Sequence, residues 1–188
     1  MASRVALFGG TFDPIHNAHL EVARAAADHF CLHKVLFIPS YNPPHKEGAK
    51  AAFEDRARMC ELACRTDPRF EVSRIEEGSE RSYSILTIEK LQAAGMRELS
   101  FLIGADAFAE FGTWHRWEDV AKAVEFLVVT RPGAEYAVPE GALVRELPGL
   151  ELRESSSEVR RMLGEGKWEA PVPPGVLAYI RSHHLYGT

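Results

Sequence analysis

The stretch VALFGGTFDPIHNAHL, residues 5–20, decides the fold of this chain. Its apolar start is typical of a short buried strand, which stops at Gly9 and Gly10. Turn-forming residues follow, and a segment with helical periodicity begins at His16. Glycines let a backbone approach a ligand closely, and a helix N-terminus presents unpaired N–H groups to an anion. The stretch therefore predicts a strand, a tight turn and a helix start that together bind a nucleotide phosphate.

His16 and His19 are three residues apart at the start of that helix. The spacing places both rings on one helical face, where they can point at one phosphate. Two other interpretations stay open, namely a pair of surface histidines or two ligands of a zinc site. A zinc site needs further Cys, His or carboxylate ligands at matched spacing, and the neighbouring sequence offers none.

Strand and helix patterns alternate along the chain. The first helix has a broad apolar face up to Phe30, and residues 35–38 form a second short buried strand. Strand, helix and strand in about 35 residues make a βαβ unit, which predicts a parallel sheet. Further strands are expected at residues 70–73, 99–103 and 126–130. The predicted fold is α/β, a Rossmann-like open, mostly parallel twisted sheet with helices on both faces, but without the G-x-G-x-x-G of dinucleotide-binding proteins.

Three segments give weaker patterns. Residues 76–81 are polar and are expected to form a mobile connection. Residues 134–148 contain prolines and glycines with little periodicity, so we expect them to be irregular, with a last short edge strand at 150–152. A helix that starts with prolines is expected near the C-terminus, where Pro173 and Pro174 suit a first turn.

Length and composition indicate one soluble globular domain, residues 1–188. The net charge of −5 argues against a general nucleic-acid binder, which usually has a basic face. We expect no membrane contact, because no apolar run approaches the ~18 residues of a membrane span and the N-terminus is too short in apolar length for a signal peptide.

The three cysteines, an odd number, fit a reducing compartment and predict a cytoplasmic protein. Cys60 and Cys64 are four residues apart on the apolar stripe of a helix expected from Phe53 to Cys64. This position favours core packing over a metal or redox role.

The run GGTFDPIHNAHL resembles the nucleotidylyltransferase superfamily, whose T/H-x-G-H signature follows the first strand. Within it the run is most similar to the bacterial nicotinate-nucleotide adenylyltransferase family. That family usually has glycine where this chain has Ala18, a change that leaves the histidine spacing intact. The resemblance implies an ATP site that includes Gly9, Gly10, Thr11 and Phe12.

The loop PSYNPPHK, residues 39–46, contains three prolines and is predicted to be stiff. It is either a structural loop with a solvated lysine or part of a ligand cleft, since such loops line clefts in parallel α/β folds. In the resembled family a P-P-H-K run lies beside the ATP phosphates, which implies a phosphate role for Lys46 and, less strongly, for His45.

The run SYSILT, residues 82–87, is expected to enter a helix with Ser82 or Ser84 as its N-cap. It resembles the family's S-Y-T-x-x-T run, which binds the pyridine carboxylate largely through backbone N–H groups. The resemblance therefore implies that Tyr83, Ser84 and Thr87 bind the pyridine nucleotide.

The strand at residues 99–103 is followed by Gly104 and Asp106, where parallel sheets bind ligands. Gly104 and Asp106 are both expected at the ATP site, Asp106 in addition to or instead of capping the next helix. Four aromatic residues lie between Phe108 and Trp117, most of them expected in the core. The family pattern I-G-x-D followed by T-W implies that Trp114 stacks on the pyridine.

The run ESSSEVRR, residues 154–161, is a second diagnostic stretch. Serines that open a helix leave hydroxyl and N–H groups for an anion, and Arg160 lies one turn further along. Taken alone, the run is equally compatible with an ordinary capped helix. It resembles the superfamily's I-S-S-T-x-x-R motif, which implies that Ser155, Ser156 and Arg160 bind ATP phosphates. The family's R-P-G likewise implies Arg131 at the nucleotide site.

The implied reaction is attack by the 5′-phosphate of nicotinate mononucleotide on the α-phosphorus of ATP, which gives nicotinate adenine dinucleotide (deamido-NAD) and pyrophosphate in NAD biosynthesis. No protein nucleophile is required, so catalysis should come from alignment and charge neutralisation. The expected catalytic residues are His16, His19, Lys46 and Arg160. Mg²⁺ is expected to arrive with ATP, because the sequence shows no dedicated carboxylate cage.

Three alternatives remain. Phosphopantetheine adenylyltransferases share the first motif, but they typically have threonine where this chain has His16 and are usually shorter. An enzyme for nicotinamide mononucleotide would differ only in reading an amide instead of a carboxylate. A nucleotide-sensing module would keep the fold without turnover, although it would not need His16, His19 and Arg160. The sequence leaves the oligomeric state, including a homo-oligomer, open.

Overall fold

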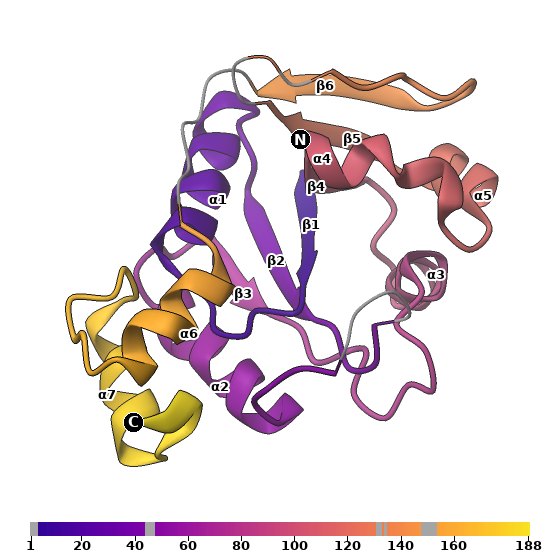
Figure 1. The fold of residues 1–188 in the computed structure, drawn as a ribbon. Coiled ribbons are helices and arrows are strands. Elements are labelled where there is room, and N and C mark those ends of the chain that lie inside the picture. The colour runs from indigo at the N-terminus through magenta and orange to yellow at the C-terminus, as the bar shows by residue number, and fades with distance from the viewer. Residues whose placement is uncertain (1–3, 44–47, 131–132, 134, 148–153) are drawn as a thin grey trace.

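A computed structural model of the chain describes residues 4–43, 48–130, 133, 135–147 and 154–188. Within these residues six strands form one sheet, in the order β3-β2-β1-β4-β5-β6 (Figure 1). Every neighbouring pair is parallel. The strands are β1 (Val5–Gly10), β2 (Lys34–Pro39), β3 (Phe70–Val72), β4 (Leu99–Gly104), β5 (Glu125–Val129) and β6 (Leu143–Leu147). This strand order is that of the doubly wound Rossmann fold, which confirms the predicted fold class.

Helices cover both faces of the sheet (Figure 1). One face carries α1 (Asn17–His29), α2 (Phe53–Cys64), α6 (Ser156–Gly164) and α7 (Pro174–Ser182). The other carries α3 (Ser84–Ala93), α4 (Ala105–Ala109) and α5 (Trp117–Ala123), together with the 3₁₀ turn η1 (Phe111–Thr113). A last 3₁₀ turn, η2 (Leu185–Gly187), follows α7.

Alternate residues of the inner strands β1, β2, β4 and β5 contribute to two separate cores. In β2, Val35 and Phe37 pack under α1 and α2, whereas Leu36 and Ile38 pack on the opposite side. This division follows from the period of two in a strand, which sends successive side chains to opposite faces. Strands buried on both faces are nearly continuous in apolar residues, which is why the sequence revealed them.

The sheet divides where the strand order reverses, between β1 and β4. Their pairing runs from Val5 opposite Leu99 to Leu7 opposite Phe101. Beyond that point β1 continues to Gly10 beside β2, and β4 continues to Gly104 beside β5. The two strands therefore part at their carboxyl ends, at the position where open α/β sheets bind ligands.

One element corrects the sequence prediction. The edge strand β6 lies inside residues 134–148, which were expected to be irregular. Among the described strands it pairs with β5 alone, and four of its five residues are exposed or half-buried. An edge strand of this kind lacks the continuous apolar pattern of the inner strands, so its sequence does not reveal it. The edge strand expected at 150–152 falls outside the described residues.

Cys60 and Cys64 lie in the core on α2, as predicted. Burial raises the pKa of the Cys64 thiol to about 12, so it stays protonated. The terminal helix α7 begins at Pro174, in agreement with the prediction. No helix among the described residues is long and apolar enough to cross a membrane.

Candidate active site

Two cavities open at the carboxyl end of β1, one on each side of it. The first, of about 420 Å³, lies over the gap between β1 and β4 and reaches α3 and η1. The second, of about 450 Å³, lies between residues 8–13, residues 48–50 and the start of α6. Both are lined by Phe8, Gly9, Gly10 and Thr11. The end of β1 therefore forms a common wall from which groups bound in either cavity can meet.

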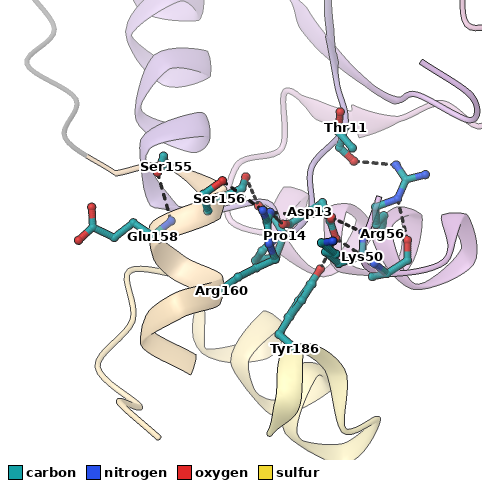
Figure 2. Close-up of polar contacts among 12 residues, drawn as sticks. Thr11, Asp13, Pro14, Lys50, Arg56, Ser155, Ser156, Glu158, Arg160 and Tyr186 are labelled. Atoms are coloured by element: carbon teal, nitrogen blue, oxygen red, sulfur yellow. Dashed lines mark hydrogen bonds and ion pairs between the residues drawn. The ribbon is translucent and has the colours of Figure 1, made fainter. Parts of the chain in front are cut away.

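The turn after β1 has three of its backbone carbonyls held by side chains from other elements (Figure 2). Arg56 on α2 donates to the Thr11 carbonyl at 2.7 Å. Arg160 on α6 donates to the Asp13 carbonyl at 2.6 Å, and the Ser156 hydroxyl donates to the Pro14 carbonyl at 3.0 Å. A free carbonyl oxygen would repel a phosphate, so these donors favour an anion beside the turn.

The Asp13 carboxylate is buried, with an exposed fraction of 5%, and accepts three hydrogen bonds. The backbone N–H of Lys50 donates at 2.7 Å and that of Ala51 at 3.1 Å. The hydroxyl of Tyr186 donates at 2.8 Å (Figure 2). With its oxygens engaged in this way, Asp13 fixes the neighbouring segments and is a poor metal ligand.

The two predicted histidines lie in contact, with ring centroids 3.8 Å apart. His16 is the N-cap residue of α1 and only 4% exposed, and burial lowers its pKa to about 4, opposed in part by the negative charge of Glu154. Its imidazole is therefore neutral at physiological pH. Nδ1 of His16 has no hydrogen-bond partner among the described residues.

His19 lines the second cavity and packs edge-on against Phe8 and Phe12. Its Nδ1 accepts the backbone N–H of His16 at 3.2 Å. A neutral imidazole has one donor and one acceptor nitrogen, so this bond places the proton on Nε2. His19 is thereby set up to donate from Nε2.

At the start of α6, Ser155 is the N-cap residue and accepts the N–H of Glu158 at 3.2 Å. Ser156 and Arg160 line the second cavity, and Arg160 also donates to the Ser157 hydroxyl at 3.1 Å. The structure therefore brings this run beside the first motif, 147 residues away in the sequence. Of the predicted phosphate-binding residues, the second cavity gathers Gly9, Gly10, Thr11, Phe12, His19, Ser156 and Arg160.

The first cavity collects the residues predicted for the pyridine nucleotide. Its lining includes Tyr83, Ser84, Thr87 and Trp114, together with Gly104. The Trp114 ring packs edge-on against Phe101 and Phe111. Tyr83 stacks on His115 with centroids 4.3 Å apart. Aromatic faces and a helix start thus meet in one cavity, as a planar anionic ligand requires.

The N-cap residue of α3 differs from the prediction. It is Tyr83, which makes no side-chain capping bond, and not Ser82 or Ser84. The Ser82 hydroxyl is engaged elsewhere, since it accepts the backbone N–H of Asn42 at 2.9 Å. No side-chain cap occupies the N–H groups at the start of α3, so these groups can bind an anion.

Asp106 is likewise not the N-cap of α4, because Gly104 occupies that position. Its side chain is exposed on α4, and it lines neither of the two cavities. His45, Lys46 and Arg131 fall outside the described residues.

The chain matches the family described as cytidylyltransferase-like over residues 7–162. It is 59% identical to a curated relative from Solibacter usitatus named "Probable nicotinate-nucleotide adenylyltransferase", over 97% of this chain and 99% of the relative. The chain belongs to the nicotinate-nucleotide adenylyltransferase family. A relative of the same name from Exiguobacterium sibiricum is 38% identical over 98% of this chain and its own full length.

Solved structures support the fold. The structure of Plasmodium falciparum nicotinic acid mononucleotide adenylyltransferase complexed with NaAD is similar with a TM-score of 0.79. The likeness covers 98% of this chain and 97% of that one, at 18% sequence identity. At 18% identity this similarity shows only that the two proteins share a fold.

Two buried charged residues of the site were missed from the sequence. Arg56, only 2% exposed, donates to carbonyls of Ala51 and Ser40 at 3.2 and 2.9 Å, as well as to Thr11. Burial lowers its pKa. The sequence did contain an indication of this burial, because Arg56 lies on the apolar stripe of α2, three residues after Phe53.

The other is Glu76, which lines the first cavity and is 7% exposed. It accepts a hydrogen bond from the Thr87 hydroxyl at 2.7 Å and one from the Tyr41 N–H at 3.4 Å. Its segment was expected to be a mobile polar connection, and this expectation is wrong at Glu76. A carboxylate in a polar run carries no local sign that tertiary contacts will bury it.

Proposed function

We propose that this protein transfers the adenylyl group of ATP to nicotinate mononucleotide, with release of pyrophosphate, in NAD biosynthesis. One observation carries the proposal, namely the two cavities that share the end of β1. One has aromatic rings and a helix start suited to an anionic pyridine, and the other has donors suited to phosphates. Their common wall suits a reaction in which two phosphate groups must meet.

In the proposed reaction an oxygen of the mononucleotide 5′-phosphate attacks the α-phosphorus of ATP. The bond between the α-phosphorus and the bridging oxygen breaks, and pyrophosphate leaves with the electron pair. The attacking phosphate is already an anion, so no residue has to remove a proton. The protein aligns the two phosphates and stabilises the charge that moves to the leaving group.

Each element has a role in this scheme. The backbone of residues 9–11 lies against the phosphates, and His19 donates from Nε2 to a phosphate oxygen. His16, neutral, supports His19 through the tilted ring contact and the backbone N–H that it donates. Ser156 and Arg160 hold the pyrophosphate part, joined by Lys46, while Arg131 completes the ATP site. Ser155 and Asp106, which line neither cavity, would contact ATP where it extends beyond them.

Mg²⁺ enters as part of the ATP substrate. Among the residues described, no group of three or more His, Cys, Asp or Glu is placed to hold a metal ion. The carboxylate that lines the phosphate cavity, that of Asp13, is engaged by three donors. A divalent cation that arrives already bound to the triphosphate fits this donor set better than a resident one.

At the pyridine end, the N-terminus of α3 reads the carboxylate through backbone N–H groups, with Ser84 and Thr87 beside it, while Trp114 and Tyr83 flank the ring. Nicotinate is favoured over nicotinamide because a helix N-terminus attracts an anion. We place the reaction in a single domain, residues 1–188, working in the cytoplasm.

The test is pyrophosphate release from ATP and Mg²⁺, with nicotinate mononucleotide, nicotinamide mononucleotide and phosphopantetheine offered in parallel. Strong preference for nicotinate mononucleotide is expected. Comparable release with the amide would overturn the carboxylate-reading role of α3. Release only with phosphopantetheine would assign a different pocket, and ATP binding with no release would favour a nucleotide sensor.

A further inference from the structure

The last turn of the chain reaches the phosphate-binding turn. Tyr186, in η2, donates its hydroxyl to Oδ1 of Asp13 at 2.8 Å, across 173 residues of sequence (Figure 2). Asp13 itself belongs to the second cavity. No motif of the sequence pointed to this contact.

Tyr186 is held in a defined conformation. Its φ of 61° lies in the left-handed region, which non-glycine residues adopt only where the surroundings impose it. His184, two residues earlier, is also left-handed, with a φ of 51°. On the α6 side, a Cβ added at Gly164 would lie 3.4 Å from the Tyr186 carbonyl oxygen, so η2 packs closely on that helix. The backbone conformation of η2 and its packing on α6 therefore hold the Tyr186 side chain toward Asp13.

The hydroxyl acts on a carboxylate that organises the ATP side of the site. Asp13 also accepts the N–H groups of Lys50 and Ala51, and residues 48–50 line the second cavity. Without the Tyr186 hydroxyl, Oδ1 would keep only its 3.1 Å bond from Ala51. The carboxylate would then be freer to turn, and the wall formed by residues 48–50 would turn with it.

A second consequence concerns Arg160. One of its guanidinium nitrogens lies 3.8 Å from Oδ2 of Asp13, at the long end of an ion pair. The Tyr186 hydroxyl holds the other oxygen of the same carboxylate, Oδ1, on the side of η2. A released carboxylate would compete with the phosphate for Arg160, because it is an anion within reach of the same guanidinium.

We propose that Tyr186 is a positioning residue for ATP, acting through Asp13 on residues 48–50 and on Arg160. The inference rests on the proposed adenylyl transfer. It assigns the effect to one substrate only, since neither Tyr186 nor Asp13 lines the cavity that collects the pyridine-binding residues.

The test compares Tyr186→Phe with Tyr179→Phe in the full chain. Tyr179 is a matched control, because it also lies near the C-terminus and donates its hydroxyl to a carboxylate, that of Asp55, at 2.9 Å. It lines neither of the two cavities. Pyrophosphate release is measured with each substrate varied in turn, below the lower Tm of the two variants.

Tyr186→Phe is expected to lower kcat/KM for ATP about tenfold, as for loss of a hydrogen bond to a charged group. Its KM for nicotinate mononucleotide should stay within about twofold, and Tyr179→Phe should match the unsubstituted protein on both substrates, since its contact lies outside both cavities. Equal loss for both substrates, or no difference between the two variants, would overturn the proposal.

If Tyr186→Phe does not fold, Asp13→Asn changes the same contact from the other side. It is expected to give the same ATP-selective defect, and an equal defect on both substrates would contradict the inference. Calorimetric binding of ATP and Mg²⁺ separates this inference from the proposed function. A protein that binds ATP but does not release pyrophosphate refutes the transfer reaction, whereas unaltered ATP affinity in Tyr186→Phe refutes the role of Tyr186.

Discussion

His19 accepts the backbone N–H of His16 through Nδ1 at 3.2 Å, and the two rings lie with their centroids 3.8 Å apart. The contact fixes both the orientation of His19 and the nitrogen that carries its proton. His16 supplies this support from a buried position in which it is uncharged at neutral pH. In the proposed reaction the pair presents Nε2 of His19 as a preorganised donor in the second cavity.

His19→Ala should lower kcat by roughly a hundredfold or more, as removal of one preorganised donor typically does. The reason is loss of the Nε2–H group where charge develops on the phosphates. Steady-state pyrophosphate release checks it, with circular dichroism to verify the fold. A folded variant with near-normal kcat would rule out the assigned role.

His16 should make the protein less stable in mild acid. Its pKa falls from 6.5 to about 4 on folding, so between these values the unfolded chain binds a proton that the folded chain does not. The contribution of His16 is thus fully present above pH 6.5 and is lost as the pH falls toward 4, by about 3 kcal/mol in total.

This loss is measured by urea unfolding at pH 7.5 and pH 5, on the unsubstituted protein and on His16→Asn. The unsubstituted protein should lose more free energy of unfolding over that interval than the variant. Parallel losses in the two proteins would mean that other groups produce the acid sensitivity.

Arg56→Met should destabilise the fold by roughly 3–5 kcal/mol, because it leaves the buried carbonyl of Ala51 and the part-buried carbonyls of Thr11 and Ser40 without their donor. Arg58→Met, two residues along α2, removes a half-exposed ion pair with Glu61 and should cost under about 1 kcal/mol. Chemical denaturation of both variants decides the point. Similar small losses in the two would show that the buried guanidinium is dispensable.

Glu76→Gln should raise the KM for nicotinate mononucleotide several-fold and leave that for ATP unchanged. Glu76 accepts from both Thr87 and the Tyr41 N–H, whereas a glutamine amide offers one accepting oxygen. Glu77→Gln, at an exposed neighbour, serves as the control. The positioning role of Glu76 would be refuted if both variants kept the original KM.

The inner strands and the helices on both faces were predictable, because burial on two faces leaves continuous apolar runs such as residues 35–38. The edge strand β6 was not, since Leu143 is exposed and the strand pairs on one side only. A sequence pattern reflects burial, and β6 is buried too little to leave a clear one, whereas the other edge strand, β3, was expected at residues 70–73.

The residues of the candidate site also fall into those that the sequence predicted and those that it did not. Its two motifs are local runs of sequence, so Gly9, His19 and Arg160 could be named before their meeting in one cavity was known. Arg56, Glu76 and Tyr186 act through contacts with distant segments. These contacts depend on tertiary packing, which residue type and spacing in the sequence do not reveal.

The most direct measurement is a crystal structure of the protein with nicotinate adenine dinucleotide bound. The pyridine ring is expected in the cavity lined by Tyr83 and Trp114, and the diphosphate against residues 9–11 beside His19. An adenine ring in that first cavity, or a diphosphate distant from the end of β1, would contradict this expectation.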